Sequence, residues 1–281
     1  MRVGDKVAIV TGASSGIGML TALTLARSGY RVIAAMRRPE QADELRRRAE
    51  QAGVAHLLDS RQLDVTDTAA IEPFVEDVHA AYGRIDVLVN NAGIAVGGFV
   101  EDVPLAAWRE QMETNFFGLI ALTRAVVPRM RAQASGTIIN MSSVSGLIAF
   151  PGYAPYAASK YAVEGFSESL RHELRTHGIR VVLIEPGAYR TSIWAKGLAR
   201  MHRSPDTPYA PMLEAVLRFS RKAADTSPDP QEVADLIGRV VRTSKPRLRY
   251  PIGRGMRMLL LGKAILPWRL LEGLIALALR R

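Results

Sequence analysis

The chain has no cysteine, and its five histidines are scattered along 281 residues. The absence of thiols excludes a disulfide framework and thiolate zinc sites. No histidines have the H-E-x-x-H spacing or a similar ligand spacing, so no metal is expected. The first residues pass at once into the apolar run 7–10, which leaves no room for the apolar segment and cleavage site of a signal peptide. A cytoplasmic location is therefore predicted.

Positive charge is concentrated near the C-terminus. The net charge is +10, and residues 242–281 contain ten Lys or Arg against one acid, Glu272, so they carry +9 and the rest of the chain carries +1. No reader module for nucleic acid accompanies this charge, so nucleic acid is not an expected partner. An anionic surface such as a membrane fits a local basic segment better.

Short apolar runs alternate with segments of helical periodicity. Runs that predict buried strands lie at 7–10, 32–36, 85–89, 137–141 and 181–184, with weaker candidates at 57–63 and 248–251. Helices are expected at 16–28, 40–52, 68–81, 105–133, 157–176, 212–223 and 230–243. This alternation predicts an α/β fold, a Rossmann-type doubly wound parallel sheet of about seven strands flanked by helices.

The chain is predicted to form a single domain over residues 1–281. Its parts are a dinucleotide-binding and catalytic core (1–187), a substrate cover (188–230), the last core helix and strand (231–255), and a basic amphipathic C-terminal extension (256–281). The cover contains an apolar set that suits a hydrophobic substrate, although the same residues would equally pack its own helices. They are Ile193, Trp194, Leu198, Met201, Tyr209, Met212, Leu213, Leu217 and Phe219.

The C-terminal extension places Lys263, Arg269, Arg280 and Arg281 among leucine-rich patches around Trp268. Charges interrupt its apolar runs before about 18 residues, so it is not a membrane span. A basic amphipathic segment with a tryptophan can lie in the lipid interface, which predicts peripheral membrane contact. The alternative is a helix packed on the body of the protein or on another subunit.

A glycine motif joins the first predicted strand to the first helix, in the stretch Thr11-Gly12-Ala13-Ser14-Ser15-Gly16-Ile17-Gly18. Gly12 permits the tight turn, Gly16 lets the backbone approach a pyrophosphate, and Gly18 allows close helix packing. The helix N-terminus then faces the anion. The alternative is an ordinary connection between a strand and a helix.

The end of the second predicted strand indicates which dinucleotide binds. NAD-selective sites place an acid there to hold the ribose hydroxyls, but this chain has Met36 followed by Arg37 and Arg38. Guanidinium groups suit a 2′-phosphate, so NADP(H) is the preferred cofactor, with NAD(H) as the alternative. The arginines could also be solvated cations that open a charged helix.

Tyr156 and Lys160 stand one helical turn apart in Tyr156-Ala157-Ala158-Ser159-Lys160. A phenol keeps its proton until about pH 10. An ammonium on the same helical face favours the phenolate, which predicts a lowered pKa for Tyr156 and a proton-handling pair. Ser143 ends a buried strand and can donate a hydrogen bond to a developing oxyanion, as could Ser142 or Ser145.

Taken together, the motifs resemble those of the short-chain dehydrogenase/reductase family. The resemblance covers residues 6–191 and rests on Thr11-Gly12-x-x-x-Gly16-x-Gly18, Asp64-Val65, Asn90-Asn91-Ala92-Gly93, Asn115, Ser143, Tyr156-x-x-x-Lys160 and Pro186-Gly187-x-x-x-Thr191. It implies a catalytic set of Asn115, Ser143, Tyr156 and Lys160. It also implies that these residues bind the cofactor: Gly12, Ser14, Ser15, Gly16, Ile17, Gly18, Arg37, Arg38, Asp64, Val65, Asn91, Ala92, Gly93, Tyr156, Lys160, Pro186, Gly187 and Thr191.

The resemblance implies a role for most of these positions. Tyr156 exchanges the proton, Lys160 also holds the nicotinamide ribose, Ser143 is selected over its neighbours, and Asn115 kinks its helix and passes protons through water. Asp64 and Val65 bracket the adenine, Asn91 lies along the cofactor, and Thr191 meets the carboxamide with Pro186 and Gly187. From the residues alone, Asp64 could instead cap the helix near 68, and Asn90-Asn91-Ala92-Gly93 could be a plain turn.

The resemblance also bears on substrate and assembly. The stretches 184–187 and 161–166 are most similar to family members that act on hydroxysteroids, retinoids and similar lipophilic alcohols or ketones. A 3-ketoacyl-thioester reductase is an alternative, because Lys196, Arg200 and Arg203 would suit a carrier-borne substrate. A non-catalytic NADP(H)-binding sensor or membrane-attached scaffold is an alternative of another class. The family implies a homodimer or homotetramer through the helices that contain Asn115 and Tyr156.

Overall fold

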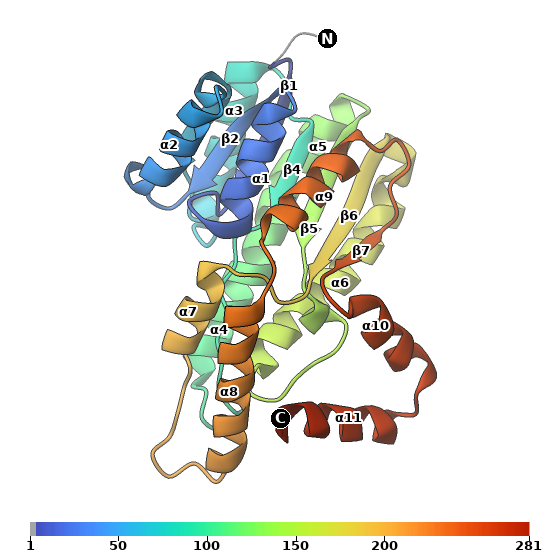
Figure 1. Ribbon diagram of the computed structural model, residues 1–281. Coiled ribbons are helices and arrows are strands. Elements are labelled where there is room, and N and C mark those ends of the chain that lie inside the picture. The colour runs from blue at the N-terminus through green and yellow to red at the C-terminus, as the bar shows by residue number, and fades with distance from the viewer. Residues whose placement is uncertain (1–3, 281) are drawn as a thin grey trace.

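Seven parallel strands form one sheet in the order β3-β2-β1-β4-β5-β6-β7 (Figure 1). The computed structural model describes residues 4–280, apart from the side chains of Trp194, Arg257 and residues 278–280. The strands are β1 (Lys6–Thr11), β2 (Tyr30–Met36), β3 (Leu58–Gln62), β4 (Val87–Asn90), β5 (Gly136–Met141), β6 (Ile179–Pro186) and β7 (Arg249–Ile252). The predicted Rossmann-type, doubly wound sheet is confirmed, and its strand order reverses between β1 and β4.

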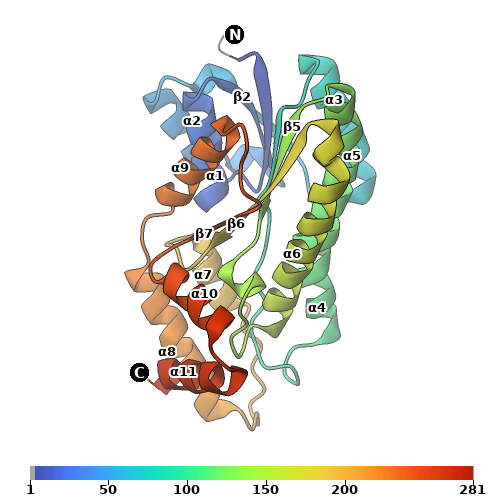
Figure 2. The same ribbon diagram turned by 90° about the vertical axis from the view of Figure 1, so that its right-hand side faces the viewer.

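Two layers of helices cover the sheet (Figure 2). One face carries α1 (Gly16–Arg27), α2 (Asp43–Gln51) and α9 (Gln231–Arg242). The other carries α3 (Thr68–Tyr82), α5 (Gly118–Ala132) and α6 (Ala154–Leu174), with α4 (Leu105–Met112) preceding α5. Strands buried on both faces are nearly continuous apolar runs, which explains why the central strands are visible in the sequence.

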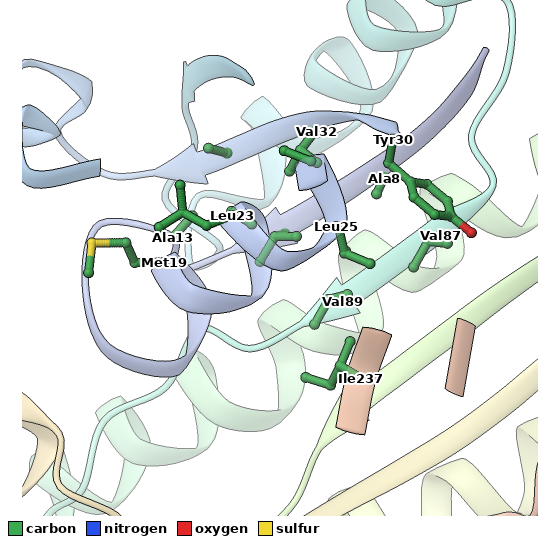
Figure 3. Packing of buried hydrophobic residues seen from close by; sticks show 14 of the residues in the cluster. Ala8, Ala13, Met19, Leu23, Leu25, Tyr30, Val32, Val87, Val89 and Ile237 are labelled. Atoms are coloured by element: carbon green, nitrogen blue, oxygen red, sulfur yellow. The ribbon is translucent and has the colours of Figure 1, made fainter. Parts of the chain in front are cut away.

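Successive side chains of β1 point alternately into the two core layers on either side of the sheet. Ala8 and Val10 of β1 pack under α1 and α9, beside Leu23 and Ile237 (Figure 3). Ile9 between them points to the opposite layer. The edge strand β3 has a mostly half-buried pattern, and for that reason its apolar signal is weak in the sequence.

The segment 105–133, predicted as one helix, is interrupted. A π-helical turn at Glu113–Phe117 separates α4 from α5. Such π-bulges insert one extra residue in a helix and occur mostly at functional sites. This turn contains Asn115, one of the predicted catalytic residues.

Four more helices lie beyond the carboxyl ends of the strands (Figure 1). They are α7 (Ser192–Ala199), α8 (Ala210–Thr226), α10 (Met256–Ile265) and α11 (Trp268–Arg280). The last of them, α11, packs on α8. Within residues 4–280, no helix combines the length and the apolar character that crossing a bilayer requires.

Candidate active site

Most of the predicted site residues gather where the carboxyl ends of β1, β4, β5 and β6 meet, whereas Arg37 and Arg38 follow β2 and Asp64 and Val65 follow β3. In open α/β sheets ligands bind in this crevice, at the point where the strand order reverses. A cavity of about 290 Å³ lies there. Its lining includes Ile17 and Asn91 from the glycine-turn side, Ser143 and Tyr156 from β5 and α6, and Val216 from α8. The cavity therefore joins the predicted cofactor residues to the predicted substrate cover.

The turn between β1 and α1 is shaped to receive an anion. Gly12 has φ +65° and Gly16 has φ +57°, in the left-handed region that favours glycine. Ser15, the N-cap of α1, makes no side-chain capping bond, and no acidic residue lies in the first turn. The amide groups at the start of α1 are thus left for a phosphate. This turn fits the pyrophosphate of a dinucleotide.

Gly18 and Asn91 hold this turn against the end of β4. A Cβ built on Gly18 would run into the Gly12 carbonyl and the Asn91 side chain. The Asn91 Nδ2 donates to the Thr11 carbonyl at 2.8 Å. The Thr11 Oγ1 accepts the backbone amides of Asn91 and Ala92, each at 2.9 Å. Thr11 is a supporting residue that was not among the predicted site residues, although it begins the glycine motif in the sequence.

The arginines after β2 are exposed and available. Within the described part of the chain, the side chains of Arg37 and Arg38 form neither an ion pair nor a hydrogen bond. They follow Met36, the last residue of β2, and so lie at the edge of the cofactor crevice. No carboxylate stands at residues 36–38 to repel a phosphate.

Asp64 closes its own turn. Its Oδ1 accepts the Thr66 amide at 3.0 Å and the Thr66 hydroxyl at 2.8 Å. The helix α3 is capped by Asp67, whose side chain accepts the Ala70 amide. The alternative that Asp64 caps this helix is therefore wrong. Val65 beside it is buried, in a position where a Cβ on Gly118 would collide with it.

Ser143 and Tyr156 meet across the cavity. Ser143 follows β5, and its Oγ accepts the Ser145 amide at 3.1 Å and donates to the Pro186 carbonyl at 3.5 Å. Tyr156 lies in the first turn of α6 and is half-buried. Burial raises the pKa of Tyr156, and the nearby Ser143 side chain opposes this rise.

Lys160 lies one turn further along α6 and is buried. Its Nζ donates to the Met141 carbonyl at 2.8 Å and lies 5.7 Å from the centre of the Tyr156 ring. Burial lowers the pKa of Lys160 to about 8, and the nearby Glu164 carboxylate opposes that shift. The lowered pKa predicted for Tyr156 is wrong for this geometry, because burial has the largest influence and the net pKa shift is upward.

Asn115 connects α6 to the loop after β4. Its Nδ2 donates to the Ile94 carbonyl and to the Ser159 hydroxyl, each at 3.1 Å, and its Oδ1 accepts the Ile94 amide at 2.9 Å. Asn115 is buried rather than solvent-facing. The helical irregularity expected at this residue is the π-turn. Within the described residues, Asn115 does not form a hydrogen bond with Lys160. It bonds instead to Ser159, the residue before Lys160.

The end of β6 completes the cofactor side. Thr191 is the N-cap of α7, and its side chain lies 3.6 Å from a Cβ built on Gly16. The amide of Gly187 donates to the Ile252 carbonyl of β7 at 2.8 Å. Pro186, Gly187 and Thr191 all line the cavity. Pro186, Gly187 and Thr191 thus share one cavity with Ile17, Asn91 and Gly93 of the predicted cofactor set.

The substrate side of the cavity is mostly apolar. Phe150, Val216 and Phe219 line it, and the Tyr153 hydroxyl forms a 2.8 Å hydrogen bond with the Ser220 hydroxyl. Of the nine predicted cover residues, Ile193 and Phe219 line the cavity. Met212 is exposed, and the Trp194 side chain lies outside the described residues. The remainder pack among themselves around Phe99: Leu198, Met201, Tyr209, Leu213 and Leu217.

Helix α10 forms part of the same wall, which sequence analysis did not foresee. Met256 and Leu259 line the cavity, and Met256 lies 3.2 Å from a Cβ built on Gly187. Lys263 donates to the Leu147 carbonyl and, at 3.3 Å, to the Tyr161 hydroxyl. The extension is therefore packed on the body of the protein. Arg281 and the Arg280 side chain lie outside the described residues.

Buried carboxylates lie behind Lys160. Arg249 Nε is 2.9 Å from Glu164 Oε2 and 3.2 Å from Glu185 Oε1, and its Nη2 is 2.6 Å from Glu168 Oε1. Glu185 has no exposed side-chain surface. Burial, followed by the charge of Glu164, raises the pKa of Glu185 to about 8. One guanidinium thus faces three carboxyl groups, and burial raises the pKa of both Glu164 and Glu185.

Comparisons with known proteins agree with this geometry. The family model for short chain dehydrogenases matches residues 6–201. The chain is 48% identical to the uncharacterized oxidoreductase YusZ of Bacillus subtilis, with 97% of this chain and 98% of the relative covered. It is 33% identical to a 3-ketodihydrosphingosine reductase of Bacteroides thetaiotaomicron (88% of each chain). It is 31% identical to an NADPH-dependent 3-dehydrocapnine reductase of Ornithobacterium rhinotracheale (95% of each).

Solved structures agree as well. A short-chain dehydrogenase of Streptomyces avermitilis superposes with a TM-score of 0.80 at 35% identity, covering 92% of both chains. A metagenomic short-chain oxidoreductase in complex with NADP gives 0.71 at 30% identity, covering 89% and 97%. A short chain dehydrogenase/reductase of Burkholderia phymatum in complex with NAD gives 0.76 at 26% identity, covering 89% and 90%. The chain belongs to the short-chain dehydrogenase/reductase family of oxidoreductases.

Proposed function

We propose that this protein is an NADP(H)-dependent oxidoreductase that transfers a hydride between the nicotinamide and a carbonyl or a primary or secondary alcohol of a hydrophobic substrate. One observation carries the proposal. Ser143, Tyr156 and the buried Lys160 line the same cavity as Ile17, in the first turn of α1 beside the anion-receiving glycine turn. A proton donor, an oxyanion donor and a dinucleotide cradle therefore face one space.

In the reductive direction, the bound dinucleotide supplies the hydride. Tyr156 gives its hydroxyl proton to the substrate oxygen, and Ser143 donates a hydrogen bond to the same oxygen as negative charge develops. The upward pKa shift of Tyr156 suits a general acid that stays protonated at neutral pH. Lys160, buried and bonded to Met141, would hold the nicotinamide ribose. Asn115, through Ser159, would fix the backbone of the Tyr156 turn.

The cofactor preference rests on Arg37 and Arg38. Both are exposed, and both would meet a 2′-phosphate at the end of β2. An NADP-bound neighbour and an NADPH-dependent relative support this choice. NAD(H) stays the alternative, since another neighbour binds NAD. The proposed contacts of Asp64, Val65, Asn91, Ala92 and Gly93 with the cofactor belong to the same proposal.

The substrate proposal rests on the apolar wall made by Phe150, Val216 and Phe219. Two relatives are named as reductases of a 3-keto and a 3-dehydro compound, which supports a ketone as the reducible group. The 3-ketoacyl-thioester alternative is weakened at Arg200, whose guanidinium is held by Glu110 at 2.8 Å. The protein is proposed to be cytoplasmic and to assemble as a homodimer or homotetramer, with peripheral membrane contact through the extension.

A substrate panel tests this proposal. NADPH consumption is followed with a long-chain ketone, a steroid ketone, retinal and a 3-ketoacyl thioester, each compared with its short soluble analogue. We expect turnover with an apolar ketone or aldehyde and a faster rate with NADPH than with NADH. NADPH binding without turnover of any carbonyl compound would support the non-catalytic sensor instead.

A further inference from the structure

The C-terminal extension exposes large apolar side chains to an unusual degree. Among the described residues, thirteen large hydrophobic side chains are exposed, and seven of them lie between residues 258 and 277. A large contiguous apolar patch rarely stays in water without a partner. The seven are Met258, Leu261, Ile265, Trp268, Leu270, Leu274 and Leu277. They lie outside the catalytic machinery described above.

These residues form helical stripes. Met258, Leu261 and Ile265 are spaced i, i+3, i+7 on α10. Leu270, Leu274 and Leu277 are spaced i, i+4, i+7 on α11. Residues at these intervals share one side of a helix. Each helix therefore has a continuous apolar side that faces outward.

The inner sides of the same helices are already occupied. Met256 and Leu259 face the cavity, and Lys263 is bonded to Leu147 and Tyr161. On α11, Leu271 is buried, and this helix packs on α8. The outward stripes are thus a second apolar side of each helix, which is not buried when the chain folds. Figures 1 and 2 show α10 and α11 following one another at an angle on the outside of the molecule, joined by a turn.

Charge indicates which partner covers this face. Residues 253–281 contain six Lys or Arg and one acid, Glu272, for a net charge of +5. Glu272 accepts a hydrogen bond from Trp268 at 2.8 Å. Arg242, Lys245, Arg247 and Arg249 also contribute to the basic C-terminus in the sequence, but they precede α10, and Arg249 is paired with Glu164, Glu168 and Glu185. Of the six cations in residues 253–281, Arg254 and Arg269 have described, exposed side chains, whereas Lys263 is bonded to Leu147 and Tyr161. An apolar face with exposed cations and a tryptophan beside it matches an anionic lipid surface.

We propose that the outward faces of α10 and α11 bind the surface of an anionic lipid bilayer, and that the bilayer delivers the hydrophobic substrate to the cavity past α10. The second part rests on the proposed function. It follows from position, because α10 contributes Met256 and Leu259 to the cavity and Met258, Leu261 and Ile265 to the outer face. One helix separates the proposed lipid contact from the site of chemistry.

Vesicle sedimentation tests the lipid contact. The full-length protein is mixed with vesicles of phosphatidylcholine alone or of phosphatidylcholine with phosphatidylglycerol. We expect binding to the anionic vesicles that weakens with salt. Ile265→Glu should weaken it about tenfold, because a carboxylate replaces an apolar contact next to anionic lipid. The matched control is Val100→Glu, since Val100 is 64% exposed and Ile265 69%, and Val100 adjoins Glu101 and Asp102. The control should bind as the wild type does.

Two results would overturn the inference. One is equal sedimentation of Ile265→Glu and the wild type on anionic vesicles. The other is loss of an oligomer in size-exclusion chromatography of Ile265→Glu with no vesicle binding by the wild type, which would assign the face to a second copy of the chain.

Delivery of substrate has its own readout. Ile265→Glu should lower kcat/KM about tenfold for a long-chain ketone dissolved in anionic vesicles and leave kcat/KM for a short water-soluble ketone unchanged. An equal effect on both ketones contradicts delivery. Absence of turnover with either ketone in the wild type contradicts the proposed function instead, while the sedimentation result still decides the lipid contact.

Discussion

The two ends of the cavity are built in different ways. At the cofactor end, Thr11 and Asn91 join two strand ends by four hydrogen bonds of 2.8–3.4 Å, and Gly18 leaves no room for a side chain. At the substrate end, α10 reaches the cavity mainly through Met256 and Leu259, which are apolar. Hydrogen bonds are directional and fix the position of backbone groups, whereas apolar contacts tolerate different shapes. The first end suits one cofactor, and the second suits a range of hydrophobic substrates.

The largest expected effect is on proton transfer, which takes place between the cofactor end and the substrate end of the cavity. Tyr156→Phe removes the proposed acid, and kcat should fall roughly 10²- to 10⁴-fold, while NADPH affinity measured by fluorescence stays nearly unchanged. Tyr161→Phe is the matched control, since Tyr161 lies on the same helix and donates to the Leu147 carbonyl at the surface. Retention of most activity in Tyr156→Phe would remove this residue from the mechanism.

The next prediction tests how tightly the cofactor end is packed. Gly18→Ala should lower the free energy of unfolding by about 1–3 kcal/mol through overpacking, and it should weaken NADPH binding as the turn shifts. Gly165→Ala on α6 is the control. A Cβ there meets nothing within 4 Å, so the variant should gain about 0.5–1 kcal/mol from helix propensity. Equal melting temperatures for the two variants would contradict the packing argument.

The pH dependence of stability tests the carboxylates behind Lys160. The pKa of Glu185 is about 8 in the folded protein, above the 4.5 of a free glutamate. Between pH 4.5 and 8, the folded state therefore keeps a proton on Glu185 that the unfolded state has already released. Stability falls as pH rises through this window, by at most about 1.4 kcal/mol per pH unit.

Glu185→Gln should reduce this slope, because an amide does not titrate. Thermal melts from pH 5.5 to 8.5 measure the difference. Glu173→Gln, at the surface end of α6, provides a control that should leave the slope as it is. A wild-type slope that survives in Glu185→Gln would assign the pH dependence to other groups.

The smallest expected effect concerns the exposed rim of the cofactor end. Arg37→Ala should raise the KM for NADPH about tenfold, the loss expected for one charge-assisted contact, and leave the KM for NADH unchanged. Arg131→Ala, an exposed arginine at the far end of α5, should change neither KM. An unaltered ratio of NADPH to NADH preference in Arg37→Ala would remove Arg37 from phosphate recognition.

Much of the fold could be predicted because each element has a local signature. The central strands are apolar runs, and the segment 16–28 contains α1 with an error of one residue. The interruption of 105–133 was predicted only through the family resemblance at Asn115, because this residue bonds to Ile94 and Ser159, which are distant in the chain. Those partners are 21 and 44 residues away in the chain.

The sequence by itself determined the sheet, the glycine turn and the spacing of Tyr156 and Lys160, since these depend on residue type and on short intervals along the chain. Tertiary structure decided the rest. The upward pKa shift of Tyr156 and the pKa of Lys160 near 8 come from burial, which the spacing of residues along the sequence does not reveal. The position of α10 beside Gly187 comes from the strand β7, which brings a segment almost seventy residues away to the cavity wall.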